Sequence, residues 1–121
     1  MYYRAFRVGM DTVHYEASAL VEYANEVLCK AGLESAHAHN VAHTLVEGAL
    51  LAHDTHGLAL LPGYVKQLEQ GAMTREGLPQ AISDRPAALL WDGRRLPGPS
   101  LVHAGIDALP HARANWVPPR L

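Results

Sequence analysis

The sequence predicts a mainly α-helical region with a small β component: three short helices, then a strand, a Pro/Gly loop and a further helix. Two observations support this prediction. Before residue 72, apolar residues recur at three- and four-residue spacing, and glycines follow the periodic runs. After it, the pattern changes to "AALLWDG", which is typical of a buried strand that ends in a turn.

The first predicted helix runs from about Tyr15 to Ala31, and Gly32 follows as its C-terminal stop. The second begins near Ser35, whose hydroxyl caps free backbone amides, and ends at Gly57. The residues expected on their apolar faces are Leu20, Ala24, Val27, Leu28 and Ala31 in the first helix, and Val41, Leu45, Ala49 and Ala52 in the second.

The third predicted helix covers Leu61 to Gln70, with Pro62 in its first turn and Gly71 as its stop. The loop "RRLPGPS" separates the strand from the last predicted helix, "LVHAGIDALPHARA", in which Pro110 must lie near a kink or an end. The final "NWVPPRL" cannot continue that helix, because adjacent prolines lack amide donors.

Composition limits the class of protein. The chain has 121 residues, 49% of them hydrophobic and 18% charged, which suits one globular domain. A net charge of -2 and a pI near 6.4 argue against nucleic acid or anionic membranes as partners. Cys29 is the single cysteine, which excludes an internal disulfide and fits a reducing cytoplasm. The N-terminus has no apolar signal-peptide core, and no stretch is long and apolar enough to span a membrane. We therefore expect a soluble cytoplasmic protein.

The cluster "HDTHG", residues 53–57, lies where the second helical pattern ends. A histidine there is explained either as a cation that stabilises a helix C-terminus or as an immobilised proton donor and acceptor. Asp54 is likewise open to interpretation as a simple turn former.

A metal site is the third interpretation of the histidines. His39 and His43 share a helix face, and His53 and His56 would add two further imidazoles. The sequence has neither the Glu of a HExxH motif nor a cysteine cluster, so we expect no metal site. His37, like His39 and His43, is expected to be a solvated helix residue.

The strings "HDTHGLALLPGYVKQLEQGAM" and "AALLWDGRRLPGP" together resemble the N-terminal part of the malate/L-lactate dehydrogenase family. These NAD(P)-dependent oxidoreductases include ureidoglycolate and 2,3-diketogulonate dehydrogenases and cyclic imino-acid reductases. The family typically shows a helical pair, an Asp-Ser/Thr-His-Gly turn, a Tyr-containing helix ending in Gly, and a strand finishing in Asp-Gly. The resemblance covers about residues 15–114. It implies the N-terminal part of an α/β (α+β) oxidoreductase that is not a Rossmann fold.

The resemblance also implies roles for site residues. His56 would be the catalytic acid/base that protonates a substrate carbonyl oxygen, and Thr55 and Tyr64 would bind substrate. Asp54 would orient the turn. Leu60 stands where many members have an Arg that pairs with a substrate carboxylate, which leaves the substrate open.

Family members are longer, and a central domain holds their NAD or NADP. The resemblance therefore implies that residues 1–14 are an N-terminal extension and 15–121 the helical region of a truncated dehydrogenase, without the cofactor domain. It implies a homodimer, a small 2-oxo or 2-hydroxy acid as substrate, and little turnover by the isolated chain. The alternative is a non-catalytic helical remnant or dimerisation module.

Overall fold

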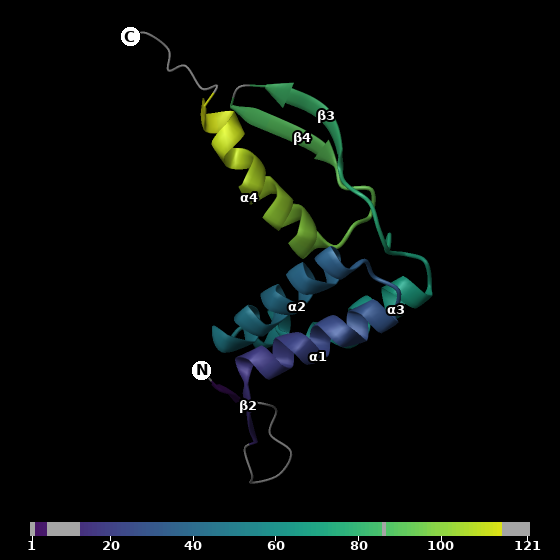
Figure 1. The fold of residues 1–121 in the computed structure, drawn as a ribbon, viewed down its shortest axis with the longest axis vertical. Coiled ribbons are helices and arrows are strands. Elements are labelled where there is room, and N and C mark those ends of the chain that lie inside the picture. Colours follow the sequence, from purple (N-terminus) through teal and green to yellow (C-terminus); the bar gives the residue numbers. More distant parts are fainter. Residues whose placement is uncertain (1, 5–12, 86, 115–121) are drawn as a thin grey trace.

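The computed structural model of the chain describes residues 2–4, 13–85 and 87–114, apart from the side chains at 2–4, 54 and 110–114. Figure 1 shows three helices gathered into one body, with a fourth helix and a β-hairpin extending from one end of it. The elements in chain order are β1 (Tyr2–Arg4), β2 (His14–Glu16), α1 (Ala17–Lys30), α2 (Ser35–Leu50), the 3₁₀ turns η1 (Asp54–His56) and η2 (Leu58–Leu60), α3 (Leu61–Glu69), β3 (Gln80–Arg85), β4 (Ala88–Asp92) and α4 (Gly98–Ala114).

The core lies between α1, α2 and α3. The two longest of these helices turn most of their predicted apolar faces inward, and α3 adds leucines from one side. The prediction is wrong for Ala52, which lies beyond the end of α2 and is exposed. The buried cluster consists of Ala24, Leu28, Leu33, Ala38, Val41, Ala42, Leu45, Leu61 and Leu68. Apolar burial of this kind is the main source of stability for helices of this length.

All three helices end in the same hydrogen-bonded motif. After α1, the Gly32 amide donates to the Cys29 carbonyl and the Leu33 amide to the Leu28 carbonyl, both at 3.0 Å. This pair of bonds is the Schellman motif, which needs a left-handed residue at its turn. Gly32 has φ +97° and Gly71, after α3, has φ +69°, which confirms both glycine stops.

The predicted end of α2 is wrong. The helix stops at Leu50. Ala52, with φ 59°, takes the left-handed position after the helix end, and the sequence analysis did not predict a positive φ for this residue. The amides of Ala52 and His53 complete the motif by donating to the carbonyls of Ala49 and Gly48. Gly57 is extended, at φ -99° and ψ -153°, and follows η1.

The predicted cap at Ser35 is also wrong, because Ser35 is the first helical residue and Glu34 occupies the cap position without a side-chain capping bond. Glu34 is engaged elsewhere. Its amide donates to the Arg75 carbonyl at 2.8 Å, and its carboxylate accepts the Gly77 amide at 3.2 Å. A tertiary contact therefore replaces the local cap.

The strand prediction is correct in position but wrong in environment. β4 is half of an antiparallel hairpin with β3, which the sequence analysis did not predict. The strand is not buried: Leu90 is 56% exposed and, among the described residues, β4 pairs only with β3. Side chains of both β4 and α4 border a groove.

The remaining predictions concern the ends of the chain. β2 occupies His14–Glu16, so α1 begins two residues later than expected, and β1 pairs with β2 in antiparallel fashion. α4 continues through Pro110 to Ala114, which places that proline near the helix end. The "NWVPPRL" segment lies outside the described residues, as do residues 5–12 of the proposed extension.

Candidate active site

The His-Asp-Thr-His-Gly cluster forms a tight turn against the end of α2. Asp54, Thr55 and His56 make the single 3₁₀ turn η1, in which the His56 amide donates to the His53 carbonyl at 2.8 Å. The cluster thus lies beyond the α-helix rather than in its last turn.

Two glycines bring this turn close to α2. A Cβ atom added at Gly48 would stand 2.7 Å from the His56 carbonyl oxygen. A Cβ atom at Gly57 would stand 3.0 Å from the Ala49 Cβ and 3.1 Å from its Cα. The distance at Gly48 is too short for any side chain, and those at Gly57 are tighter than ordinary van der Waals contacts, so the glycines permit the backbone of His56 to rest on the helix. The position of His56 is therefore fixed by packing.

Thr55 and His56 interact directly. The Thr55 Oγ1 lies 2.9 Å from the His56 Nδ1, within hydrogen-bond distance. Both residues are exposed. The bond to Nδ1 leaves Nε2 without a hydrogen-bond partner among the described residues, so this nitrogen is available to exchange a proton with a ligand.

The other predicted site residues differ in what the structure describes of them. Tyr64 lies in α3 and packs, half-buried, against the core cluster; burial raises the pKa of its hydroxyl. No hydrogen bond joins it to His56 among the described residues. The backbone of Asp54 is in η1, but its side chain lies outside the description. Leu60 ends η2 and is 39% exposed.

The histidines of α2 divide into two kinds. His39 and His43 are exposed, as expected, with ring centroids 6.1 Å apart. His37 was expected to be solvated, which is wrong: it is 7% exposed, and its Nε2 donates to the Gly77 carbonyl at 2.9 Å. Within the described ranges, no three His, Cys, Asp or Glu side chains are grouped so that they could hold a metal ion.

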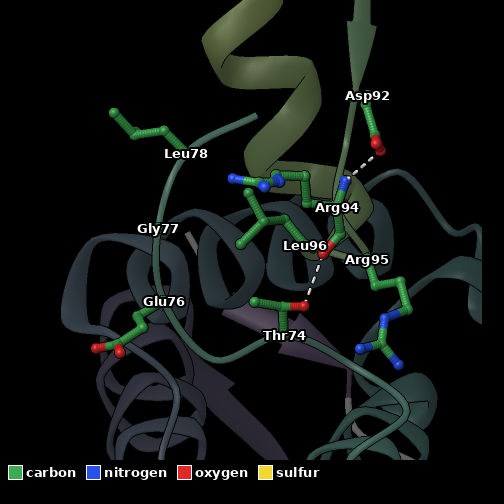
Figure 2. Close-up of a pocket in the computed structure, with 8 residues that line it drawn as sticks. All are labelled: Thr74, Glu76, Gly77, Leu78, Asp92, Arg94, Arg95 and Leu96. Atoms are coloured by element: carbon green, nitrogen blue, oxygen red, sulfur yellow. Dashed lines mark hydrogen bonds between the residues drawn. The ribbon is translucent and has the colours of Figure 1, made fainter. Parts of the chain in front are cut away.

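A pocket that the sequence analysis did not predict lies at the β4–α4 connection (Figure 2). Its volume is about 490 Å³, and its lining residues are Thr74, Glu76, Gly77, Leu78, Asp92, Arg94, Arg95 and Leu96. Arg94 and Arg95 have φ values of 53° and 60°, and the Leu96 amide donates to the Gly93 carbonyl across them. Two left-handed central residues define a type I′ turn, which normally selects Asn-Gly, so no local sequence signal indicates this conformation at two arginines.

No helix in the described part of the chain combines the length and apolar character needed to cross a membrane.

Comparison with known proteins places this architecture in context. Hydroxycarboxylate dehydrogenase B of Escherichia coli is 30% identical over 98 residues, which are 80% of this chain and 27% of that protein. Delta(1)-pyrroline-2-carboxylate reductase of Ancylobacter novellus is 32% identical over 84 residues, covering 69% of this chain and 25% of that protein. The chain therefore spans about a quarter of the length of these relatives.

The fold is also shared with a solved structure, malate dehydrogenase from Pyrococcus horikoshii. The TM-score is 0.82 at 21% identity, over 93% of this chain and 32% of that one. The family model described as malate/L-lactate dehydrogenase matches residues 15–115, which include α1 to α4 and the His56 turn. This match extends over most of the sequence, and the chain belongs to the malate/L-lactate dehydrogenase family of oxidoreductases.

Proposed function

We propose that this chain supplies the proton-transfer residue of an oxidoreductase that interconverts a small 2-oxo acid and its 2-hydroxy acid, with His56 as acid/base. One observation carries the proposal: the exposed His56 imidazole is held through Nδ1 by Thr55 at 2.9 Å, on a turn packed against α2. A histidine fixed in this way has one nitrogen for orientation and one for chemistry.

The proposed step is general acid catalysis. When hydride reaches the carbonyl carbon of the substrate, negative charge develops on its oxygen, and the His56 Nε2 donates a proton there. In the reverse direction Nε2 accepts the hydroxyl proton. With Nδ1–H donating to Thr55 Oγ1, the Thr55 hydroxyl keeps its own hydrogen for a substrate oxygen. The Thr55 hydroxyl would then have two roles at the same time, orienting His56 and binding the substrate.

Tyr64 and Asp54 have supporting roles in this proposal. Tyr64 would line the substrate side of the site from α3, and Asp54 would orient the turn. Leu60 cannot pair with a carboxylate, so the substrate carboxylate would be held by another residue or replaced by a different group. The similarity to a pyrroline-2-carboxylate reductase extends the candidate substrates to cyclic imino acids.

NAD or NADP is the hydride source that the family resemblance implies. Thr55 and His56 are exposed, which leaves the His56 side of the turn open to a substrate and its hydride donor. We derive no step through a nicotinamide and propose that residues outside the described ones hold the cofactor. A cytoplasmic location belongs to the same proposal.

A chimaera tests the role of His56 in a completed enzyme. Residues 15–115 of this chain would replace the matching region of the E. coli hydroxycarboxylate dehydrogenase B, and NADH oxidation with 2-oxo acids would be measured. We expect His56→Ala to lower kcat by about 100-fold or more, the usual contribution of a general acid. His53→Ala, three residues away on the same exposed turn, is the matched control and should retain activity. Equal kcat values for the two variants would remove His56 from the mechanism.

A second candidate function, an association module that forms homodimers, is favoured by an apolar groove between β4 and α4. The groove has a volume of about 400 Å³ and is bordered by Leu89 and Trp91 of the strand. From α4, Val102 and Ile106 also line it, although they are 61% and 56% exposed. Exposed apolar surfaces of this kind are typical of interaction sites.

Light scattering of the 121-residue chain tests the association. A dimer should dissociate in Ile106→Asp but persist in Leu51→Asp, which adds the same charge at a 70% exposed position outside the groove. A wild-type protein that stays monomeric at high concentration would contradict this function.

A further inference from the structure

The pocket at the Arg94–Arg95 turn is separate from the turn that carries His56. Its walls are the 74–78 segment after α3 and the 92–96 turn that leads from β4 to α4 (Figure 2). None of the residues in the proposed proton-transfer site lines it.

Hydrogen bonds hold the arginine turn in place. The Thr74 hydroxyl donates to the Arg94 carbonyl at 2.6 Å, and the Thr74 amide donates to the Arg95 carbonyl at 2.9 Å. On the other side, the Asp92 carboxylate accepts the Arg94 amide at 2.8 Å. The turn is therefore fixed from both neighbouring segments, although its two central residues have a backbone conformation that disfavours side chains.

The opposite wall is fixed as well. The Gly77 carbonyl accepts a hydrogen bond from the buried His37 at 2.9 Å, and the Gly77 amide donates to the Glu34 carboxylate at 3.2 Å. Both contacts attach the 74–78 segment to the N-terminal turn of α2. The pocket is thus bounded by two tethered segments rather than by free loops.

The two guanidinium groups differ in their surroundings. Arg95 Nη1 donates to the Gly71 carbonyl at 3.4 Å. The Arg94 guanidinium has no ion pair or hydrogen bond with any described residue, and in Figure 2 it extends across the pocket towards Gly77 and Leu78. It is a cation on a fixed backbone, facing a cavity.

Two carboxylates also line the pocket, but neither forms an ion pair with the Arg94 guanidinium among the described residues. Asp92 accepts the Arg94 backbone amide through Oδ1 and caps the turn. The Glu76 carboxylate points away from the Arg94 guanidinium in Figure 2. The positive group that faces the cavity is therefore not neutralised by a direct ion pair in the described structure.

We propose that this pocket binds a small oxyanion, a carboxylate or a phosphate group, with Arg94 as its principal ligand. Asn-Gly would form the same turn with less strain, so a pair of arginines at this site suggests a requirement for guanidinium. The planar guanidinium offers paired N–H donors that match both oxyanions. Anchoring its backbone also reduces the entropy lost when the ligand binds.

The test is titration of the full 121-residue chain with inorganic phosphate and, separately, with malonate, followed by ¹⁵N–¹H NMR. We expect saturable binding of at least one of them in the millimolar range, with the largest shifts at the Gly77, Arg94 and Arg95 amides. Saturation by phosphate alone identifies a tetrahedral ligand group, and saturation by malonate alone identifies a carboxylate.

Two variants distinguish this site from general charge attraction. Arg94→Gln should weaken binding at least about tenfold, because hydrogen bonds to charged groups contribute most to holding an oxyanion. Arg85→Gln removes an exposed arginine from β3, outside the pocket, and should bind as the wild type does. Unchanged binding in Arg94→Gln, or wild-type shifts that are absent or centred elsewhere, would overturn the proposal. If Arg94→Gln does not fold, the positions of the chemical-shift changes in the wild-type protein still test the proposal.

Discussion

The α-carbon of Gly48 lies against the main chain of His56, so closely that a Cβ atom added to this glycine would stand 2.7 Å from the His56 carbonyl oxygen. This contact joins the last turn of α2 to the proposed proton donor. Because a backbone carbonyl cannot rotate away as the end of a side chain can, any side chain at Gly48 must displace either α2 or η1.

Gly48→Ala should therefore destabilise the protein and move His56. Overpacking of this kind costs about 1–3 kcal/mol. The gain in helix propensity, about 1 kcal/mol at most, offsets only part of it. We expect a lower free energy of unfolding in urea, together with changed NMR shifts for Thr55 and His56.

The control is Gly63→Ala in α3, where an added Cβ has nothing within 4 Å. This variant should be neutral or more stable by up to about 1 kcal/mol, because only helix propensity changes. If Gly48→Ala behaved in the same way, the close packing of η1 on α2 would be disproved.

Ala52→Gly should stabilise the protein. Ala52 is left-handed, with φ 59°, at the position where the other helix ends have glycine. Removing the Cβ atom from this left-handed residue should raise the free energy of unfolding by about 1–2 kcal/mol. Part of this gain is lost because glycine has more conformational freedom in the unfolded chain. A net gain of about 0.5–1 kcal/mol is expected in urea denaturation.

The reciprocal change is Gly71→Ala after α3, at φ 69° and with nothing within 4 Å of an added Cβ. It should destabilise by about 1 kcal/mol through backbone strain alone. Equal effects of the two substitutions in the same direction would contradict the assignment of a shared helix-ending motif.

These two positions explain why the fold was only partly predictable. The ends of α1 and α3 follow from glycine, which needs no tertiary contact to adopt a positive φ. The end of α2 does not, because the left-handed residue of its motif is Ala52, and an alanine carries no local signal for a positive φ. The environment of β4 escaped prediction because an apolar run in a hairpin and a buried strand have the same local pattern.

His37→Ala should loosen the 74–78 segment. The side chain is 7% exposed and bonds to Gly77, 40 positions later, so the substitution removes a bond and leaves space. The expected loss is about 1–2 kcal/mol in the free energy of unfolding, with faster amide exchange at Gly77.

His39→Ala is the matched control, because His39 is exposed on the same helix. It should change stability by no more than about 0.5 kcal/mol. Similar losses for both variants would mean that the His37 bond contributes nothing beyond helix propensity.

The same contrast applies to the candidate sites. Thr55 and His56 are neighbours in sequence, so a motif in the chain was sufficient to bring them together. The role of His37 depends on a segment 40 residues away, and the Arg94–Arg95 turn depends on Thr74, 20 residues before Arg94. Contacts of this range leave no periodic or motif signal, and only the folded chain brings the residues together.

Tyr64 should make stability fall with pH in alkaline solution. Burial raises the pKa of the Tyr64 hydroxyl above its usual value of 10.0, so the folded state holds this proton more tightly than the unfolded state does. The stabilising effect is complete below the unfolded-state pKa. It is lost as pH rises from about 10 towards the folded-state pKa, because only the unfolded chain then releases the proton.

Urea denaturation at a series of pH values across this window, for wild type and Tyr64→Phe, isolates the effect from other titrating groups. The variant should lose less stability as pH rises, since it has no hydroxyl to ionise. Tyr23→Phe, at a position 61% exposed on α1, is the control and should keep the wild-type pH dependence. A Tyr64→Phe curve parallel to the wild type would show that the hydroxyl is as accessible to water in the folded chain as in the unfolded one.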